Sequence, residues 1–320
     1  MRALCGWIAI LVAGCTSEPA PEKWECETPA DATATADLTL TVKDAVVSPV
    51  AGSAFLAWTY DGDVPGPVLR LPLGAKRTVK LVNRSPRPAS LHFHGVEYAV
   101  GDDGSADSGG VVNPGCAHVY TITAKVPGVW PFHSHRDSRT EMARGLYGAV
   151  IVPAPGEKQA DHEFVAFLGQ LGIEGEGHGG EEGDSEEEGS AAPSFFMTIN
   201  GRAYGGAEVI EWKQDRYAIS TGTVATARVG QRVRFRALNV SPDDMHTFHL
   251  HGHRWCDRDG VMQDDGTCPA GTLPTDNVLL APAQGASLEF VEDNPGTWMY
   301  HCHIVDHVND GMHAFYKADQ

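Results

Sequence analysis

The segment HCHIVDHVNDGM, residues 301–312, is the stretch of this sequence that most narrows its fold and chemistry. It offers a thiolate at Cys302, an imidazole at His307 and a thioether at Met312. These are the soft ligands of a blue copper site with a weak axial methionine. If the segment begins as a β-strand, Cys302 faces one way, and His301 and His303 face the other. One strand would then serve two copper sites joined by a few covalent bonds, an arrangement that suits electron transfer.

Three more histidine clusters lie at residues 92–94, 133–135 and 246–251. Repeated clusters of this kind predict a multinuclear metal site, because chance pairs of surface histidines would not recur four times. Zinc is the competing metal, but a closed zinc site takes four ligands and no thioether. Together the four clusters supply ten histidines and one cysteine: His92, His94, His133, His135, His246, His249, His251, His301, His303, His307 and Cys302.

These clusters resemble those of the multicopper oxidases, and most closely those of the two-domain bacterial laccases. The resemblance extends from about residue 36 to residue 317, and it implies an all-β chain with two cupredoxin-like Greek-key β-sandwich domains. The matching segments are LHFHG (91–95), WPFHSH (130–135), HTFHLHGHRW (246–255) and HCHIVDHVNDGM (301–312), with DGDVPGPVLRLPLG (61–74) and GLYGAVIV (145–152) also similar.

An internal duplication supports the two-domain reading. GAKRTVKLVNRSP (74–86) aligns with GQRVRFRALNVSP (230–242), and PGVWPFHSH (127–135) aligns with PGTWMYHCH (295–303). Short alternating runs between Gly and Pro turns are typical of antiparallel sandwiches. The first copy has Ser134 where the second has Cys302, and a serine cannot replace a thiolate on copper. We therefore expect a blue copper in the second domain alone.

The expected boundaries follow from this duplication and from composition. The first domain should cover 36–168 and the second 194–320. The stretch 169–193 between them is rich in glycine and acidic residues, and it should form a solvated surface loop. A metal-scavenging role for this loop is the less favoured alternative.

The resemblance implies a role for each ligand and four copper ions per chain. The blue (type 1) copper would bind His246, Cys302, His307 and Met312. The single type 2 copper of a trinuclear cluster would bind His92 and His249, and the type 3 pair would bind His94, His133, His135, His251, His301 and His303. Since each half supplies four cluster ligands, a first domain must meet a second domain. In two-domain laccases this contact lies between neighbouring subunits of a homotrimer, which we expect here.

The implied reaction couples oxidation of phenolic or similar one-electron donors to reduction of O₂ to water. Asp103 and Asp276 are candidate proton relays, although a single Asp is often a turn or cap residue. Tyr98 matches a tyrosine near the cluster, with simple packing as the alternative. The alternatives in function are a metal-ion oxidase, a copper-binding electron-transfer protein and a nitrite-reductase-like enzyme. The resemblance disfavours the last, because that family carries its blue copper in the first domain.

Four further histidines fall outside this ligand set: His118, His162, His253 and His313. His253 extends the HLHGH motif and should order the ligand loop, and the other three should be ordinary histidines.

The N-terminus predicts export and anchoring. Arg2 precedes an apolar run and the sequence Val-Ala-Gly-Cys15, which is similar to a bacterial lipoprotein cleavage site. We expect a signal peptide over 1–14, a lipidated Cys15, a flexible tether over 15–35 and a location in the bacterial cell envelope; an ordinary signal peptide is the alternative. The net charge of −18 argues against nucleic acid as a partner.

The seven cysteines fit an oxidising compartment. Cys5 lies in the signal, Cys15 at the lipid site and Cys302 on copper. The remaining four allow three pairings. We favour Cys256–Cys268, which flanks a turn-rich segment, together with Cys26–Cys116.

Overall fold

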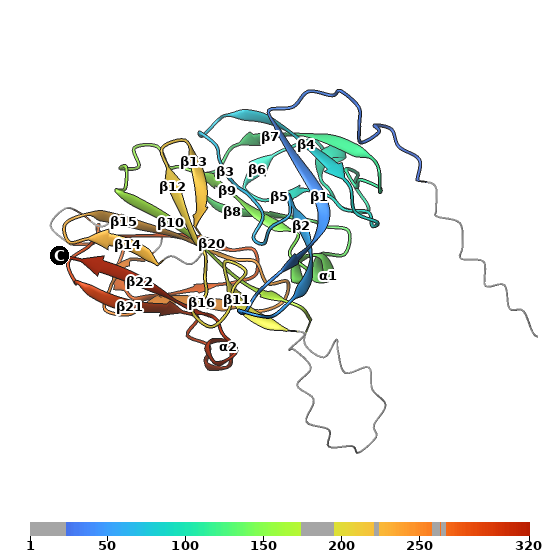
Figure 1. Ribbon diagram of the computed structural model, residues 1–320. Coiled ribbons are helices and arrows are strands. Elements are labelled where there is room, and N and C mark those ends of the chain that lie inside the picture. The colour runs from blue at the N-terminus through green and yellow to red at the C-terminus, as the bar shows by residue number, and fades with distance from the viewer. Residues whose placement is uncertain (1–23, 174–194, 221–223, 258–262, 264–266) are drawn as a thin grey trace, which may run out of the picture.

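A computed structural model describes residues 24–173, 195–220, 224–257, 263 and 267–320 (Figure 1). The expected signal peptide, Cys15 and most of the acidic stretch lie outside these residues, so what we expect of them stays a prediction. Within the described part of the chain, no helix has the length and apolar character needed to span a membrane.

The first domain is a sandwich of two sheets whose apolar side chains, such as Leu81, Ile122 and Phe132, meet between them. The short helix α1 (Ser138–Ala143) follows the second histidine cluster, and the 3₁₀ turn η1 (Val100–Asp102) follows the first. One sheet has the order β2 (Phe55–Tyr60), β1 (Leu38–Val47), β4 (Lys76–Asn83), β7 (Ala117–Ala124), β6 (Val96–Glu97). The other has the order β3 (Val68–Arg70), β9 (Tyr147–Val152), β8 (Gly128–His133), β5 (His92–Phe93).

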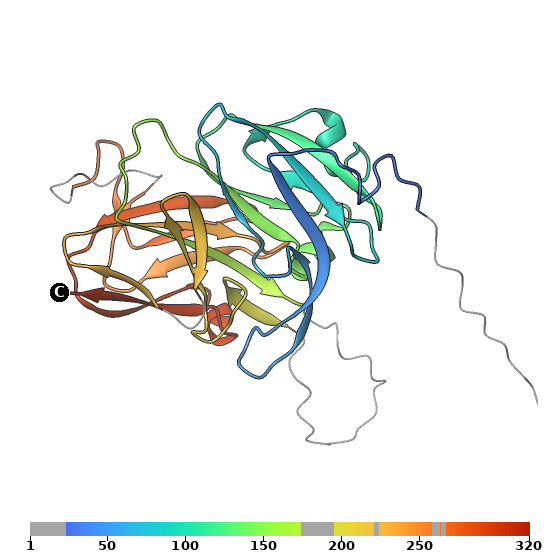
Figure 2. The same cartoon turned by 45° about the horizontal axis from the view of Figure 1, so that its top comes forward.

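The second domain repeats this plan, so the predicted all-β fold with two β-sandwich domains is confirmed (Figures 1 and 2). One sheet has the order β13 (Arg216–Ser220), β12 (Val209–Lys213), β10 (His162–Leu171), β15 (Arg232–Asn239), β20 (Gly285–Val291), and β11 (Phe196–Ile199) also pairs with β10. The facing sheet has the order β14 (Ala225–Arg228), β22 (His313–Asp319), β21 (Gly296–His301), β16 (His246–Leu250), β19 (Asn277–Leu280). A two-stranded ribbon, β17 (Trp255–Cys256) with β18 (Pro274–Thr275), and helix α2 (Val305–Asn309) complete it.

Strand β10, which begins before the expected domain boundary at residue 168, lies in a sheet of the second domain. Strand β10 pairs in parallel with β15, just as β1 pairs in parallel with β4, so β10 is the first strand of the second sandwich. Strands β10 and β11, which precede and follow the acidic stretch in the sequence, therefore belong to the same sheet. The start of the second domain could not be located from the sequence, because nine consecutive residues of β10 are buried. A strand covered on both faces lacks the alternation of polar and apolar residues that marks a half-exposed strand.

The two domains share an apolar contact. Val129 and Ile151 of the first domain belong to one buried cluster with Phe167 and Leu238 of the second. Gly285 of β20 approaches the first domain so closely that a Cβ there would lie 2.3 Å from the Val129 carbonyl oxygen. The packing fixes the position of each histidine cluster relative to the other within one chain.

A buried ionic network also joins the domains. Glu163 on β10 accepts from Arg70 of the first domain, and its Oε2 lies 2.9 Å from Arg236 Nη2 on β15. Burial alone would raise the pKa of Glu163, but Arg236 and Arg70 outweigh it and hold the pKa at about 2. Because this value lies below that of an unfolded glutamate, the network stabilises the fold above pH 4.5, and this contribution is lost as the pH falls toward 2.

Replacing Glu163 with Gln should lower the free energy of unfolding by roughly 3–5 kcal/mol near neutral pH, because it removes one of the carboxylates that neutralise the buried Arg234 and Arg236. The difference between wild type and variant should shrink as the pH falls from 4.5 to 2. Denaturant unfolding of the copper-free proteins at several pH values measures this difference in the free energy of unfolding. A difference between wild type and variant that stays constant down to pH 2 would contradict the assigned pKa.

The favoured disulfides are both present, Cys26–Cys116 and Cys256–Cys268, with Cα–Cα distances of 5.4 and 5.5 Å. The first one corrects the expected tether over 15–35. From Cys26 onward the chain is fixed to the first domain by the disulfide and by a hydrogen bond from Ala30 N to Gly115 O.

Candidate metal centres

A buried cysteine sulfur and two imidazoles converge in the second sandwich. Cys302 Sγ lies 3.9 Å from His246 Nδ1 and 3.6 Å from His307 Nδ1, and the two nitrogens are 3.1 Å apart. His246 begins β16, Cys302 follows directly after β21, and His307 lies on α2. Met312 is fully buried, belongs to the same core cluster as Cys302, and accepts from the Cys302 amide through its carbonyl oxygen.

Neighbouring groups prepare this site for a metal ion. Ser241 Oγ lies 2.7 Å from His246 Nε2, which turns the Nδ1 atom toward Cys302. Burial lowers the pKa of His246 to about 3, with a smaller effect of His307, so its imidazole is neutral and able to bind a metal near neutral pH.

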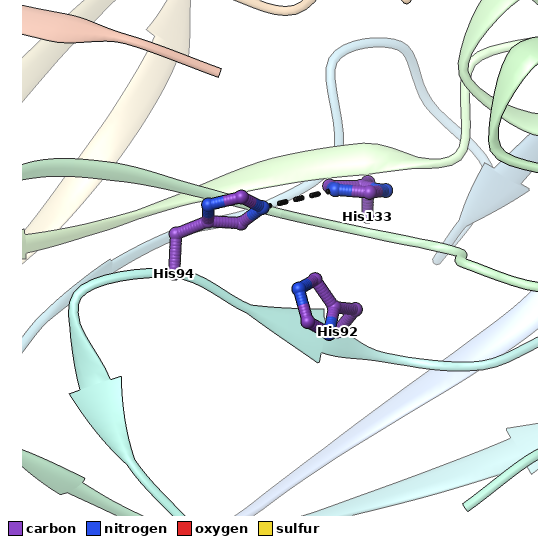
Figure 3. Close-up of side chains that lie close together, drawn as sticks. All are labelled: His92, His94 and His133. Atoms are coloured by element: carbon purple, nitrogen blue, oxygen red, sulfur yellow. Dashed lines mark hydrogen bonds between the residues drawn. The ribbon is translucent and has the colours of Figure 1, made fainter. Parts of the chain in front are cut away.

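A second group of imidazoles gathers in the first domain (Figure 3). His94 Nε2 and His133 Nε2 lie 3.1 Å apart, and the His92 ring approaches both. The His135 ring stacks edge-on against His92 at 4.6 Å between centroids. Burial lowers the pKa of His133 to about 3 and that of His94 to about 4.

The second domain carries the same group in the same arrangement. His251 Nε2 lies 3.0 Å from His301 Nε2, and the His249 ring contacts His251, His301 and His303. The alternation predicted for HCH holds, since Cys302 is fully buried in the core while His303 is exposed on the other side.

Backbone carbonyls set the tautomers of both groups alike. His92 Nδ1 donates to the Asp103 carbonyl at 2.8 Å, and His249 Nδ1 donates to the Asp276 carbonyl at 2.7 Å. Since a carbonyl can only accept, each donating Nδ1 carries the proton and leaves Nε2 free as a metal ligand. His133 and His301 do the same toward the carbonyls of Ser134 and Cys302.

The two four-histidine groups, which we call the first half-site (His92, His94, His133, His135) and the second half-site (His249, His251, His301, His303), stay apart within one chain. All eight residues belong to the described part of the structure, and no ring contact found there joins one half-site to the other. Metal-competent groupings appear separately as His92/His94/His133, His249/His251/His301 and His246/Cys302/His307.

Family profiles match most of the chain. A profile described as multicopper oxidase matches residues 41–157, and a second one with the same description matches residues 197–319. The chain belongs to the multicopper oxidase family.

Relatives of this multicopper oxidase have diverse names. It is 30% identical over 297 residues to a probable nitrite reductase-hydroxylamine oxidoreductase fusion protein of Kuenenia stuttgartiensis, covering 88% of this chain and 31% of that protein. It is 27% identical to a copper-containing nitrite reductase of Neisseria meningitidis serogroup B (85% and 63% covered) and to human hephaestin (79% and 22%). The chain therefore spans less than two thirds of the length of each of these relatives.

Solved structures agree on the fold. A blue copper oxidase and a copper nitrite reductase, both from Nitrosomonas europaea, each superpose with a TM-score of 0.67 at 22% and 24% identity. Each match covers 88% of this chain, with 85% of the oxidase and 93% of the reductase. The fold alone does not separate the two activities.

The candidate ligand atoms of this chain suit copper. A fully buried sulfur beside two Nδ1 atoms is the arrangement of a blue copper site. The half-sites, built from four imidazoles each, also suit copper. The residues present thus fit the metal that the family implies.

Of the three predicted catalytic residues, Tyr98 and Asp103 contact each other beside His92, and Asp276 lies beside His249. Tyr98 OH donates to Asp103 Oδ1 at 3.2 Å, and that carboxyl oxygen lies 3.6 Å from His92 Nδ1. A hydrogen bond from Ser105 leads the effects that lower the pKa of Asp103. The carbonyl oxygen of Asp276 accepts a hydrogen bond from His249, and Asp276 is exposed to solvent.

The histidines outside the ligand set have other partners. His253 is buried, donates from Nδ1 to the His251 carbonyl at 2.8 Å, and contacts the buried carboxylate of Glu292 through Nε2 at 3.1 Å. The expectation that His253 orders the ligand loop agrees with these contacts. His118 pairs with Asp102 at 2.8 Å. His162 bonds Glu211 and Gln231, and the His313 ring contacts Tyr204 and Phe315.

Sequence reasoning missed three hydroxyl residues that hold the ligands: Ser241, Thr247 and Ser90. The signal for Ser241 was present in the repeated Asn-x-Ser-Pro motif, but its partner His246 has no counterpart histidine in the first copy, where Ala89 stands. Thr247 and Ser90 lie at equivalent places of the two copies, two residues before His249 and His92.

Proposed function

We propose that this multicopper oxidase is a laccase-like enzyme that takes single electrons from small donors at the Cys302 site and reduces O₂ to water at the histidine half-sites. The observation that carries the proposal is the pairing of two matching four-histidine groups with one buried thiolate between His301 and His303. Bound copper would supply the one-electron couple at the sulfur and the O₂-reducing centre at the imidazoles. Four donors each lose one electron, and O₂ with four protons and four electrons gives two waters.

The chain itself supplies the connection between the two sites. Cys302 is covalently joined on both sides to histidines of the second half-site, so an electron received by copper bound at Cys302 would have only a few bonds to cross. Ser134 at the equivalent place is buried and accepts from Ser90 N at 3.0 Å. The Ser134 oxygen thus serves as a hydrogen-bond acceptor, and it is no thiolate that could bind a blue copper. This supports a single electron entry site, in the second domain.

The half-sites support an intersubunit cluster. Each one holds four imidazoles, and within a chain they do not touch, so we propose that the first half-site of one chain meets the second half-site of its neighbour in a homotrimer. A repeated contact of this head-to-tail kind closes into a ring and gives equivalent clusters at every interface.

Proton supply falls to the group around His92 in this proposal. Asp103 is partly open to solvent and accepts from Tyr98, so it can exchange protons with water beside a cluster ligand. Asp276 remains a candidate on the opposite half-site through its place beside His249. A redox role for Tyr98 is compatible with its hydrogen bond to Asp103.

Nitrite reduction is the second candidate function, because a relative that covers most of this chain is named a copper-containing nitrite reductase. An electron-transfer protein without an acceptor reaction is the third, and it would leave the half-sites without a use. Phenols are the donors we favour, with metal ions as the alternative class.

A donor screen on the copper-loaded protein separates these functions. We expect O₂ uptake with phenolic donors at one O₂ per four electrons and without accumulating peroxide. Under argon, nitrite should not sustain donor oxidation. Donor oxidation that needs nitrite and ignores O₂ would favour the second function, and a protein that is reduced but passes electrons to neither acceptor would favour the third.

A further inference from the structure

Thr247 contacts the thiolate and a cluster ligand at the same time. Its backbone N–H donates to Cys302 Sγ at 3.4 Å, and its hydroxyl oxygen accepts from the His303 N–H at 2.6 Å. The same hydroxyl lies 3.9 Å from Cys302 Sγ. Thr247 is thus placed between the two sites that the proposed function requires to work together.

The first domain provides an internal comparison without a thiolate. Ser90 occupies the equivalent place, its N–H donates to Ser134 Oγ at 3.0 Å, and its hydroxyl oxygen accepts from the His135 N–H at 2.9 Å. A hydroxyl at this position therefore anchors the last histidine of each H-x-H segment whether or not a cysteine is present. Only in the second domain does the residue at this position also contact a sulfur atom, that of Cys302.

Hydrogen-bond direction follows from the partners. The Thr247 oxygen accepts from the His303 amide, so its own proton remains available for another acceptor. An ionised Cys302 sulfur can only accept, so the hydroxyl would donate to it alongside the Thr247 backbone N–H. Two donors on one thiolate withdraw charge from the sulfur, and hydrogen bonding around the cysteine sulfur tunes the reduction potential of a blue copper site.

We infer that Thr247 is a positioning residue that both raises the reduction potential at the Cys302 site and holds His303 in place at the cluster. This inference rests on the proposed function for its consequence in turnover, although its spectroscopic consequence needs only copper at Cys302. The chemical reason is that a single hydroxyl satisfies the His303 amide and directs its proton to the sulfur.

The test replaces Thr247 with Val, which keeps the branched shape and removes the hydroxyl, and with Ser, which restores it. In the copper-loaded protein, Thr247→Val should lower the reduction potential of the blue site and move the visible sulfur-to-copper band to lower energy. It should also weaken copper binding or turnover by about tenfold or more, the usual effect of removing a group that orients a ligand. Thr247→Ser should restore the potential, the band and the copper content.

Ser90→Ala is the matched control in the first domain. It removes the anchor of His135 and should weaken the cluster, but it should leave the blue band and its potential unchanged, because Ser90 has no thiolate partner. Thermal unfolding of the copper-free proteins checks that each variant folds. If Thr247→Val does not fold, Thr247→Ala replaces it in the test.

Several results would overturn the inference. A band and potential that do not move in the valine or alanine variant would remove the role at sulfur, and an equal shift in Ser90→Ala would show that the effect is not local. Unchanged copper content and turnover in the Thr247 variants would remove the role at His303. If wild type shows the blue band but no O₂ uptake, the proposed function fails while the band and potential test of Thr247 stays valid.

Discussion

Replacing Cys302 with serine should abolish the intense visible absorption of the copper-loaded protein and reduce donor oxidation to the uncatalysed level. The absorption arises from charge transfer between the thiolate and copper, and a serine hydroxyl at this position is neutral and hard. Cys302 is fully buried and is the one free cysteine among the described residues, so no other thiol there can take its place. The half-sites should still bind copper, because none of their ligands changes.

Ser134→Ala is the matched control for this experiment. It removes the oxygen at the equivalent place in the first domain, and the blue absorption should survive. Visible spectra and copper content of both variants provide the measurement. A blue band that persists in Cys302→Ser would place the electron entry site elsewhere in the chain.

Two inactive variants should regain activity when they assemble together. One has His92 and His94 replaced, and the other has His249 and His251 replaced, so each lacks one half-site. If the cluster lies between subunits, an intact first half-site of one chain can meet an intact second half-site of its neighbour. Random assembly should produce such a pairing at about a quarter of the interfaces, and activity should rise from background to a similar fraction of wild type.

The controls for complementation are each variant expressed alone and the two mixed after separate assembly without subunit exchange. Both should stay inactive. Verified mixed oligomers without activity, or a wild type that is active as a monomer, would contradict an intersubunit cluster. The separation of the half-sites within one chain is what makes this prediction strong.

The sequence could predict which histidines gather together, because their positions follow from strand geometry. In HCH the alternation of side chains sends Cys302 into the core and brings both flanking histidines against His249, as the structure shows. The two disulfides were also the favoured pairings. The duplication further indicated that the first copy would lack a thiolate.

Other features could not be predicted because the sequence holds no local signal for them. Strand β10 is buried on both faces and shows no alternation, so the second domain seemed to start later than it does. Asp276 holds His249 through its carbonyl oxygen, which any residue could provide, so no side chain in the sequence marks this contact. Glu292 reaches His253 from 39 residues away, across the sandwich.

Anaerobic reduction followed by reoxidation tests the central claim most directly. The copper-loaded protein is reduced under argon until its blue band disappears, and measured amounts of O₂ or of nitrite are then added. The account predicts that O₂ restores the band at one molecule per four electrons, yields water rather than peroxide, and that nitrite leaves the band bleached. A band that stays bleached under O₂ and returns with nitrite would contradict it.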